Sequence, residues 1–290
     1  MLRTLLFLFA AALIGLAIYS PRWLLQTSAV GTAAPVPAAV TKVAMVPVSA
    51  PLETDVPDFS AYQSVRDRKQ AFFGFLAPLV AAENDRIEWQ RLQLLALEAI
   101  INEQGLTALN QEQLQFLERL ADRYRVDFEP EGELSASLSA LKRRVDVVPE
   151  TLVLVQAANE SGWGTSRFAR DALNFFGQWC FSEGCGLVPN ARSDDANHEV
   201  RRFESVNASV RSYLLNINTH PAYAQLRAIR EKRRLNGEEI RALDLTPGLL
   251  SYSERGEEYI AELNAMIRVN RPIILTVMDE QVSEPAAPPE

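Results

Sequence analysis

The sequence contains little histidine and cysteine, with two residues of each among 290. His198 and His220 have no metal-ligand spacing to the cysteines, so we expect no metal centre. A GxSxG motif is also absent, which excludes the usual serine hydrolase arrangement. Basic residues are outnumbered, because 29 Lys and Arg stand against 37 Asp and Glu and give a formal net charge of −8. This balance argues against nucleic acid as a main partner, since phosphate binding requires a basic surface.

The N-terminus carries an uncharged apolar run from Leu5 to Tyr19, directly after Arg3. The run is long for a signal peptide and slightly short for a membrane span, which needs about 20 residues. Small residues that permit cleavage follow near Ser28 and Ala34. Both interpretations direct the rest of the chain out of the cytoplasm. We favour an uncleaved anchor and keep a cleaved signal as the alternative.

Composition divides the chain into segments. A Pro- and Ala-rich stretch cannot propagate a helix and is typical of an extended linker. The C-terminal SEPAAPPE predicts a disordered tail. We therefore expect an anchor or signal at 1–25, a linker at 26–58, a helical region at 59–144, the main domain at 145–275 and a tail at 276–290.

The folded part is expected to be mainly helical. Apolar residues at three- and four-residue spacing predict a helix from Val65 that ends at Gly105, and Asn110 is a plausible cap for the next one. A helix from Pro149 to Asn159 is apolar almost all round, which predicts a buried central helix. Helices are expected again at 167–174 and from Val206, including one over 238–243. The basic run 230–234 is expected on a solvated helix face.

One region breaks the helical pattern. Between Phe175 and Phe203 the sequence is rich in Gly, Cys, Pro, Asp and Asn. A strand at 200–203 is expected to pair with either 180–181 or 186–188 and to form a small hairpin lobe. The fold class is therefore mainly α with a small β-hairpin lobe (α+β).

Glu160 is a single acid at the end of the apolar helix, followed by Gly162, Trp163 and Gly164. Loss of hydration raises the pKa of such a carboxyl group. A carboxyl group that stays protonated can act as a general acid on a leaving oxygen, as in sugar hydrolysis. Trp163 offers a flat face of the kind against which sugars stack. The alternative is that Glu160 caps local backbone or pairs with Arg167 or Arg170.

Several motifs in order resemble one known family. ANESGWGTSRFA followed by LNFFGQWCF resembles the glucosaminidase domain of peptidoglycan hydrolases, which include the flagellar-rod muramidase and many autolysins. Four further stretches extend the resemblance to the bacterial Bax-like proteins, over about Val65 to Arg271: KQAFFGFLAPLVAAEN, WCFSEGCGLVP, HEVRRFESVNASVRSYLLNINTHPAY and GLLSYSERGEEYIAEL. The resemblance implies a lysozyme-like fold of two lobes with a cleft, here with extra N-terminal helices.

The resemblance also implies cleavage of the β-1,4 bond after N-acetylglucosamine in the glycan strands of peptidoglycan, with Glu160 as the acid. It implies a turn beside the cleft at Asn174, Phe176 and Gly177, which we expect to contact substrate. Phe175 replaces the usual Leu of this turn. A tyrosine of the family is matched by Tyr259, although 256–258 departs from the usual loop. Tyr213 is a further candidate for substrate binding.

The second catalytic group stays open at this point. Glu199 is the candidate on the hairpin lobe, with Glu183, Asp194 and Asp195 as rivals. A separation of about 5 Å from Glu160 indicates retention, and about 6.5–9.5 Å indicates inversion. A third route uses the acetamido oxygen of the substrate, with Tyr259 steadying the intermediate.

Cys180 and Cys185 are expected to form a disulfide if the chain is exported, with reduced thiols as the alternative. The function expected from these observations is an exported, monomeric peptidoglycan hydrolase in the periplasm, anchored in the inner membrane. Proton transfer by carboxyl and hydroxyl groups requires no cofactor. A non-catalytic envelope protein that binds glycan or a partner is one alternative, and transglycosylase-type cleavage is another.

Overall fold

The structure is a computed structural model that describes residues 51–129, 132–190 and 198–283. The chain divides into two compact units, Met1–Lys42 and Val43–Glu290, and all described residues belong to the second. The predicted anchor therefore lies outside the described residues, as does the linker as far as residue 50. Within the described ranges, no helix is both long and apolar enough to cross a membrane.

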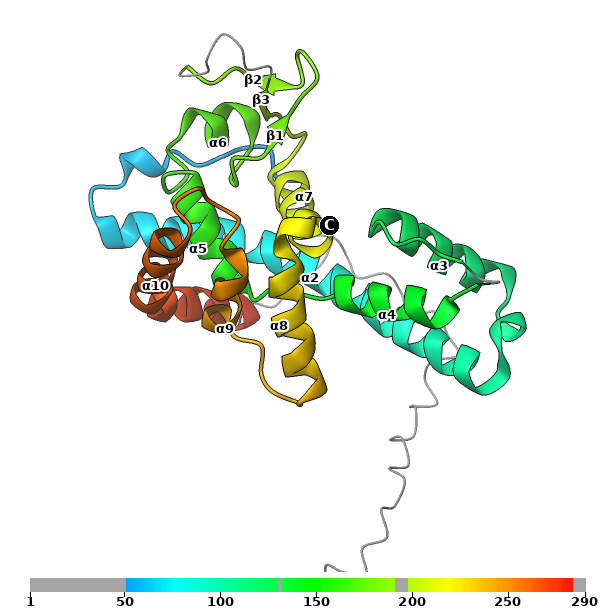
Figure 1. Ribbon diagram of the computed structural model, residues 1–290. Coiled ribbons are helices and arrows are strands. Elements are labelled where there is room, and N and C mark those ends of the chain that lie inside the picture. Colours follow the sequence, from blue (N-terminus) through cyan, green and yellow to red (C-terminus); the bar gives the residue numbers. More distant parts are fainter. Residues whose placement is uncertain (1–50, 130–131, 191–197, 284–290) are drawn as a thin grey trace, which may run out of the picture. The chain divides into compact units, whose positions relative to one another are not determined.

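The second unit is mainly helical with one small antiparallel sheet, as the sequence predicts (Figure 1). The α-helices are α2 (Val65–Gln104), α3 (Gln111–Arg123), α4 (Leu134–Arg144), α5 (Glu150–Glu160), α6 (Arg167–Ala172), α7 (Val206–Thr219), α8 (Ala224–Leu235), α9 (Ala242–Leu245) and α10 (Glu257–Ser283). Short 3-10 helices lie at Phe59–Ala61, Leu106–Ala108, Pro221–Tyr223 and Thr246–Leu249. The strands are β1 (Trp179–Cys180), β2 (Gly186–Leu187) and β3 (Glu199–Arg201).

Helix α5 is the buried central helix that the apolar run predicts. All seven residues from Leu152 to Ala158 are buried, because α2, α9 and α10 pack against α5. Pro149 is the N-cap, and Glu160 is the last helical residue. The helix thus begins and ends one residue later than predicted, which places the acid inside the last turn and fixes its direction.

Helix α2 runs for 40 residues and contributes to two hydrophobic clusters. Its first half joins the main core around α5, through residues such as Phe72 and Phe73. Its second half packs with α3 and α4 in a separate cluster that includes Leu94, Leu117 and Leu141. Ser64 caps its start and Gly105, at a φ of 85°, ends it. The cap predicted at Asn110 forms a full capping box with Gln113.

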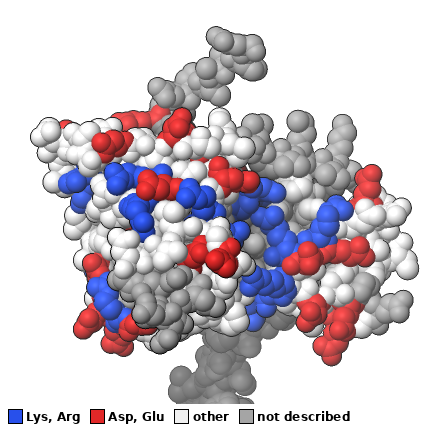
Figure 2. All heavy atoms as spheres, turned by 90° about the horizontal axis from the view of Figure 1, so that it is seen from above, with Lys and Arg blue, Asp and Glu red and all other residues white. Residues whose placement is uncertain are grey.

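The sheet has the strand order β1-β3-β2, with β3 in the middle. Val200 of β3 lies opposite Trp179 of β1 on one side and Leu187 of β2 on the other. The sequence predicts one pairing or the other, and the structure forms both because a strand has two edges. Figure 2 views the molecule from above. On the face seen there, Lys and Arg side chains form a band, with Asp and Glu side chains between them.

Three predicted segments differ from the structure. The helix expected over 238–243 is wrong, because Gly237 ends α8 in a left-handed turn and α9 starts only at Ala242. The tail does not begin at 276, since α10 continues to Ser283 and buries Ile274 and Val277 in the core. The basic run 230–234 is not fully solvated, because the Arg230 side chain is 0% exposed.

Candidate active site

The chain turns sharply after Glu160, at the end of α5. Gly162, Trp163 and Gly164 all have positive φ, at 57°, 60° and 75°. Left-handed backbone favours glycine, and a Cβ on Gly164 would also lie 2.4 Å from the Phe59 ring. The two glycines around the tryptophan are therefore needed to leave the helix within one turn, and Trp163 adopts its unusual φ between them.

The carboxylate of Glu160 is held through one of its two oxygens. The Tyr259 hydroxyl donates to Oε1 at 3.1 Å, and the Asn159 amide donates to the same oxygen at 3.4 Å. On the other side, a Cβ added at Gly177 would lie 3.9 Å from Oε2. Among the ion pairs of residues 51–129, 132–190 and 198–283, none includes Glu160. The alternative partners Arg167 and Arg170 therefore do not bind it.

The environment of Glu160 favours its protonated form. Burial raises the pKa of its carboxyl group, and nearby Glu262 acts in the same direction. Hydrogen bonds from Tyr259 and Asn159 and the charge of Arg255 lower the pKa, but the net shift is upward. A carboxyl group with a raised pKa keeps its proton to a higher pH than an ordinary glutamate, which suits it to proton donation.

A chain of buried hydrogen bonds leads to this carboxylate from three helices. The Tyr213 hydroxyl of α7 donates to Gln156 of α5, and the Gln156 amide donates to the Tyr259 hydroxyl of α10 at 3.0 Å. Tyr259 in turn donates to Glu160. Gln156 is 0% exposed, so both of its polar atoms depend on these two phenols. The chain fixes the direction of the Tyr259 proton toward Glu160.

Stacked aromatic rings hold the phenols in place. The Tyr252 ring stacks on Tyr259 with centroids 5.4 Å apart, and Phe176 stacks on Tyr213 at 4.1 Å. Burial raises the pKa values of Tyr213, Tyr252 and Tyr259 above the ordinary phenol value, and the charge of Glu160 adds to the shift. All three hydroxyls therefore stay protonated and serve as donors.

Sequence reasoning missed three members of this site, Gln156, Asn159 and Tyr252. Gln156 is the only polar residue among the seven buried ones of α5, and it precedes Glu160 by four residues. That spacing places both side chains on the same helix face. The signal for Gln156 was therefore present. Tyr252 lies in the stretch GLLSYSERGEEYIAEL, but its loop has no periodicity that predicts its direction.

Three residues expected to contact substrate lie in the core. Asn174, Phe176 and Tyr213 are 1%, 3% and 1% exposed. Such side chains present no face to a sugar, so their predicted direct contact with substrate is corrected to a supporting role. The Asn174 amide donates to the backbone oxygens of Gln178 and Arg201 and thereby joins the turn to the sheet. Gly177, also in this turn, does approach Glu160.

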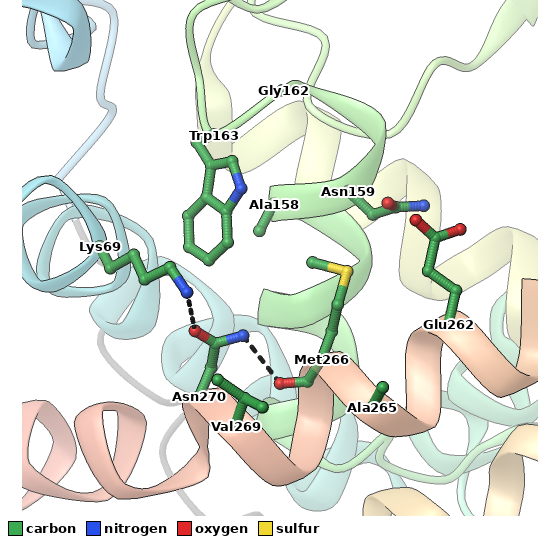
Figure 3. A pocket seen from close by; sticks show the side chains of 10 residues that line it. All are labelled: Lys69, Ala158, Asn159, Gly162, Trp163, Glu262, Ala265, Met266, Val269 and Asn270. Carbon is green, nitrogen blue, oxygen red and sulfur yellow. Dashed lines mark hydrogen bonds between the residues drawn. The ribbon is translucent and has the colours of Figure 1, made fainter. Parts of the chain in front are cut away.

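The Trp163 ring packs against aromatic side chains of α2. Its ring meets Phe72 and Phe73 edge to face, at 5.7 and 5.5 Å between centroids. The Lys69 ammonium lies 4.7 Å from its ring centroid. Trp163 thus packs against α2 and also forms the wall of a side groove (Figure 3), and its predicted contact with a sugar stays a prediction.

Glu199 is engaged inside the hairpin lobe. Its Oε1 accepts the Gly184 amide at 3.0 Å and its Oε2 accepts the Gly186 amide at 2.7 Å, and the residue is 6% exposed. Cys180 and Cys185 form a disulfide next to it. The two sulfurs and a Glu199 oxygen lie within 4.8 Å of one another, but the disulfide and the amides occupy these atoms.

The second catalytic group stays a prediction, because none of the other candidate acids is placed beside Glu160. Glu183 is exposed on the tip of the same loop, whereas Asp194 and Asp195 lie outside the described residues. The charged side chains that chiefly act on the pKa of Glu160 are Arg255 and Glu262. Among the described residues, no carboxylate of the hairpin lobe is named with these two.

A partly buried glutamate with a raised pKa thus lies at the end of a central helix, close to a turn that leads into a small sheet. Residues 135–271 match the glucosaminidase family model, described as mannosyl-glycoprotein endo-beta-N-acetylglucosaminidase. The domain thus supports a glycan-cleaving or glycan-related function.

A relative extends this likeness beyond the domain. The chain is 32% identical over 225 residues to Protein bax of Escherichia coli (strain K12), and the match covers 78% of both proteins. The chain therefore belongs to the Bax-like family of glucosaminidase-domain proteins. No solved structure matches it.

Proposed function

We propose that this protein is a glycoside hydrolase that cleaves the β-1,4 bond after N-acetylglucosamine in peptidoglycan, with Glu160 as the general acid. The observation that carries the proposal is the carboxyl group of Glu160. Its pKa is raised by burial, its Oε1 is held by Tyr259 and Asn159, and its Oε2 lies on the side of Gly177. The family match supports the choice of a glycan as substrate.

In this proposal, Glu160 gives its proton to the glycosidic oxygen while the bond from that oxygen to the anomeric carbon breaks. One product leaves with a new hydroxyl group. A water molecule later adds its hydroxyl to the anomeric carbon, and its remaining proton returns to Glu160. Oε2 is the oxygen that carries the transferred proton, because both hydrogen bonds from the described neighbours end on Oε1.

The geometry favours a route without a protein nucleophile. Both oxygens of Glu199 accept backbone amides, so using them on a sugar would break two hydrogen bonds of the hairpin. We therefore propose that the acetamido oxygen of the substrate attacks the anomeric carbon. Tyr259 is 2% exposed and acts as a positioning residue through Glu160 rather than on the sugar itself.

We further propose that the protein acts in the periplasm, held at the inner membrane by the apolar run at Leu5–Tyr19. The disulfide between Cys180 and Cys185 supports an oxidising compartment. The band of Lys and Arg side chains in Figure 2 suits a polymer that carries carboxylates, as peptidoglycan does.

The test is digestion of purified peptidoglycan by wild type, Glu160→Gln and Glu150→Gln, in gels that contain the polymer. Glu150 begins the same helix and its pKa is also raised by burial, so it is a matched control at the other end of α5. We expect loss of digestion in Glu160→Gln alone, with both variants folded. Digestion by Glu160→Gln equal to that by wild type would refute the assignment.

Product analysis separates the remaining functions. Hydrolysis yields reducing ends, whereas transglycosylase-type cleavage yields anhydro sugars, and mass spectrometry distinguishes the two. A wild-type protein that binds the strands without cutting them is the non-catalytic glycan-binding protein of the alternative hypothesis.

A further inference from the structure

A side groove of about 430 Å³ opens beside Glu160, between α5, α10 and the start of α2 (Figure 3). Its middle is apolar, formed by small and aliphatic side chains against the Trp163 ring. The lining residues of this middle part are Ala158, Trp163, Ala265, Met266 and Val269. Polar side chains stand only at its two ends, as Figure 3 shows.

The far end of the groove carries a cation, the ammonium group of Lys69. Lys69 is half-buried, its ammonium lies over the Trp163 ring, and it donates to the Asn270 amide oxygen at 2.8 Å. No acid pairs with it among the ion pairs of the described residues. Asn270 is 2% exposed and also donates to the Met266 backbone oxygen, so the ammonium is held in a fixed direction. A positioned, half-buried cation of this kind favours an anion.

The near end joins the groove to the proposed catalytic group. Asn159 lines the groove and also donates to Oε1 of Glu160. Glu262 lies beside the Asn159 side chain in Figure 3, and its carboxylate accepts a hydrogen bond from Arg255. This end therefore offers a carboxylate and an amide, which suit the N–H and C=O groups of a peptide.

We propose that this groove binds a short acidic peptide attached to the glycan next to the cleaved bond, as a peptidoglycan stem is. The inference rests on the proposed function. The amide groups of the peptide meet Asn159 and Glu262, a small side chain lies over the apolar middle, and a carboxylate reaches Lys69. The groove makes the protein selective for strands that still carry their stems.

The charges at the two ends set the direction of the bound peptide. A carboxylate at the Glu262 end would be repelled, and an N–H group at the Lys69 end would leave the ammonium unpaired. An uncharged glycan in the groove would use neither charge. The charge pattern thus selects a peptide whose acidic end points away from Glu160.

The experiment compares kcat/KM on stem-bearing strands with kcat/KM on strands whose stems an amidase has removed. We expect wild type to prefer stem-bearing strands. In Lys69→Met, which keeps an aliphatic chain over Trp163, this preference is expected to fall about tenfold, because a charge-assisted hydrogen bond is lost. Lys69→Arg should retain it. Lys232→Met, at an exposed lysine of α8, is the matched control and should leave the preference unchanged.

A second variant guards against misfolding of Lys69→Met. Val269 is 68% exposed in the same groove, so Val269→Asp adds a negative charge with little effect on packing. It should also lower the preference for stem-bearing strands. An unchanged preference in both variants, or an equal loss on both kinds of strand, would overturn the proposal.

Binding by Glu160→Gln tests the groove without catalysis. Calorimetric titration of this variant with stem-bearing and stem-free fragments should show tighter binding of the former, and Lys69→Met in that background should remove the difference. If wild type cuts neither substrate but this difference holds, the proposed hydrolysis fails and the groove assignment survives. Equal binding of both fragments removes the groove assignment alone.

Discussion

Glu160 combines a raised pKa with hydrogen bonds that oppose the shift. Burial disfavours its charged form, whereas Tyr259 and Asn159 stabilise that form without restoring the ordinary pKa. A group whose folded-state pKa is raised stabilises the fold fully below its unfolded-state pKa. That contribution is lost as the pH rises through the folded-state pKa. Above the unfolded-state pKa, the preference of this site for the protonated form therefore works against folding.

Replacement of Glu160 by Gln should raise the melting temperature at pH 7 and above, because the variant has no charge to bury. The advantage over wild type should shrink as the pH falls and disappear below the unfolded-state pKa, near about 4.3. Scanning calorimetry from about pH 3 to about pH 8 measures it. An advantage that stays constant with pH would show that the charge of Glu160 has no part in it.

Tyr259→Phe removes the hydroxyl that donates to Glu160 and should raise the pKa of that carboxyl further. The basic limb of the pH–rate profile is then expected to move to higher pH. We expect kcat to fall about tenfold, because a misplaced acid transfers its proton less efficiently. The measurement is the pH dependence of kcat on soluble glycan fragments.

Tyr124→Phe is the matched control for this change. Tyr124 is also buried, and its hydroxyl donates to Gln90 at 2.8 Å, but it belongs to the separate cluster of α2, α3 and α4. Both variants should lose a similar stability of about 1–3 kcal/mol. Only Tyr259→Phe should shift the pH profile, and a shift of equal size in Tyr124→Phe would remove the specific role of Tyr259.

At the scale of elements, the sequence predicted the features that depend on local interactions, such as helix burial and helix caps. The apolar run before Glu160 indicated a buried helix, and the caps at Asn110 and Gly105 followed from side-chain chemistry and glycine conformation. The three-stranded sheet was less predictable, because 180–181 and 186–188 both suit the same partner. The two pairings do not exclude each other, because β3 lies in the middle of the sheet and has two edges.

The hydrogen-bond chain to Glu160 could not be predicted from local sequence patterns. Gln156, Tyr213 and Tyr259 come from three helices far apart in the sequence. The resemblance to a family indicated Tyr259, but only packing shows that Tyr213 reaches it through Gln156. Tyr213 is also almost fully buried. A sequence pattern cannot distinguish a buried donor from a substrate contact, since both require an aromatic hydroxyl.

Glu199→Gln tests whether the hairpin uses this acid for structure or for chemistry. A glutamine has one acceptor oxygen, so one of the Gly184 and Gly186 amides would lose its partner. We expect a loss of about 1–3 kcal/mol in the free energy of unfolding and a modest fall in kcat. Urea unfolding and peptidoglycan digestion measure the two effects. Full loss of activity at wild-type stability would instead identify Glu199 as the second catalytic group.

At the scale of the whole molecule, one buried acid connects several elements. Asp146 is 2% exposed, lies between α4 and α5, and pairs with Arg91 of α2 and Arg230 and Arg234 of α8. The sequence placed 230–234 on a solvated face because the run is basic. Arg230 and Arg234 are four residues apart and share one face of α8, which is turned toward Asp146. Composition alone does not show that such a face is buried.

Asp146→Asn should therefore destabilise the fold by about 3–5 kcal/mol, since it leaves the fully buried Arg230 without its counter-charge. Burial opposes ionisation of Asp146, but Arg230, Arg234 and Arg91 hold the pKa of its carboxyl group below the ordinary value. For such a group, the stabilising contribution is present above the unfolded-state pKa and is lost as the pH falls through the folded-state pKa. Wild type should thus lose much of its advantage over Asp146→Asn in acid, below about pH 4.

Urea unfolding of both proteins at neutral and acidic pH measures this difference. Asp244→Asn is the control, because Asp244 pairs with Arg233 and Arg241 nearer the surface and should cost at most about 1 kcal/mol. The large effect of Asp146 follows from burial of the partner and not from the number of arginines around it. Equal losses in the two variants would mean that the Asp146 pairs add no more stability than surface pairs, and that hydrophobic packing alone holds α8 against its neighbours α4 and α9.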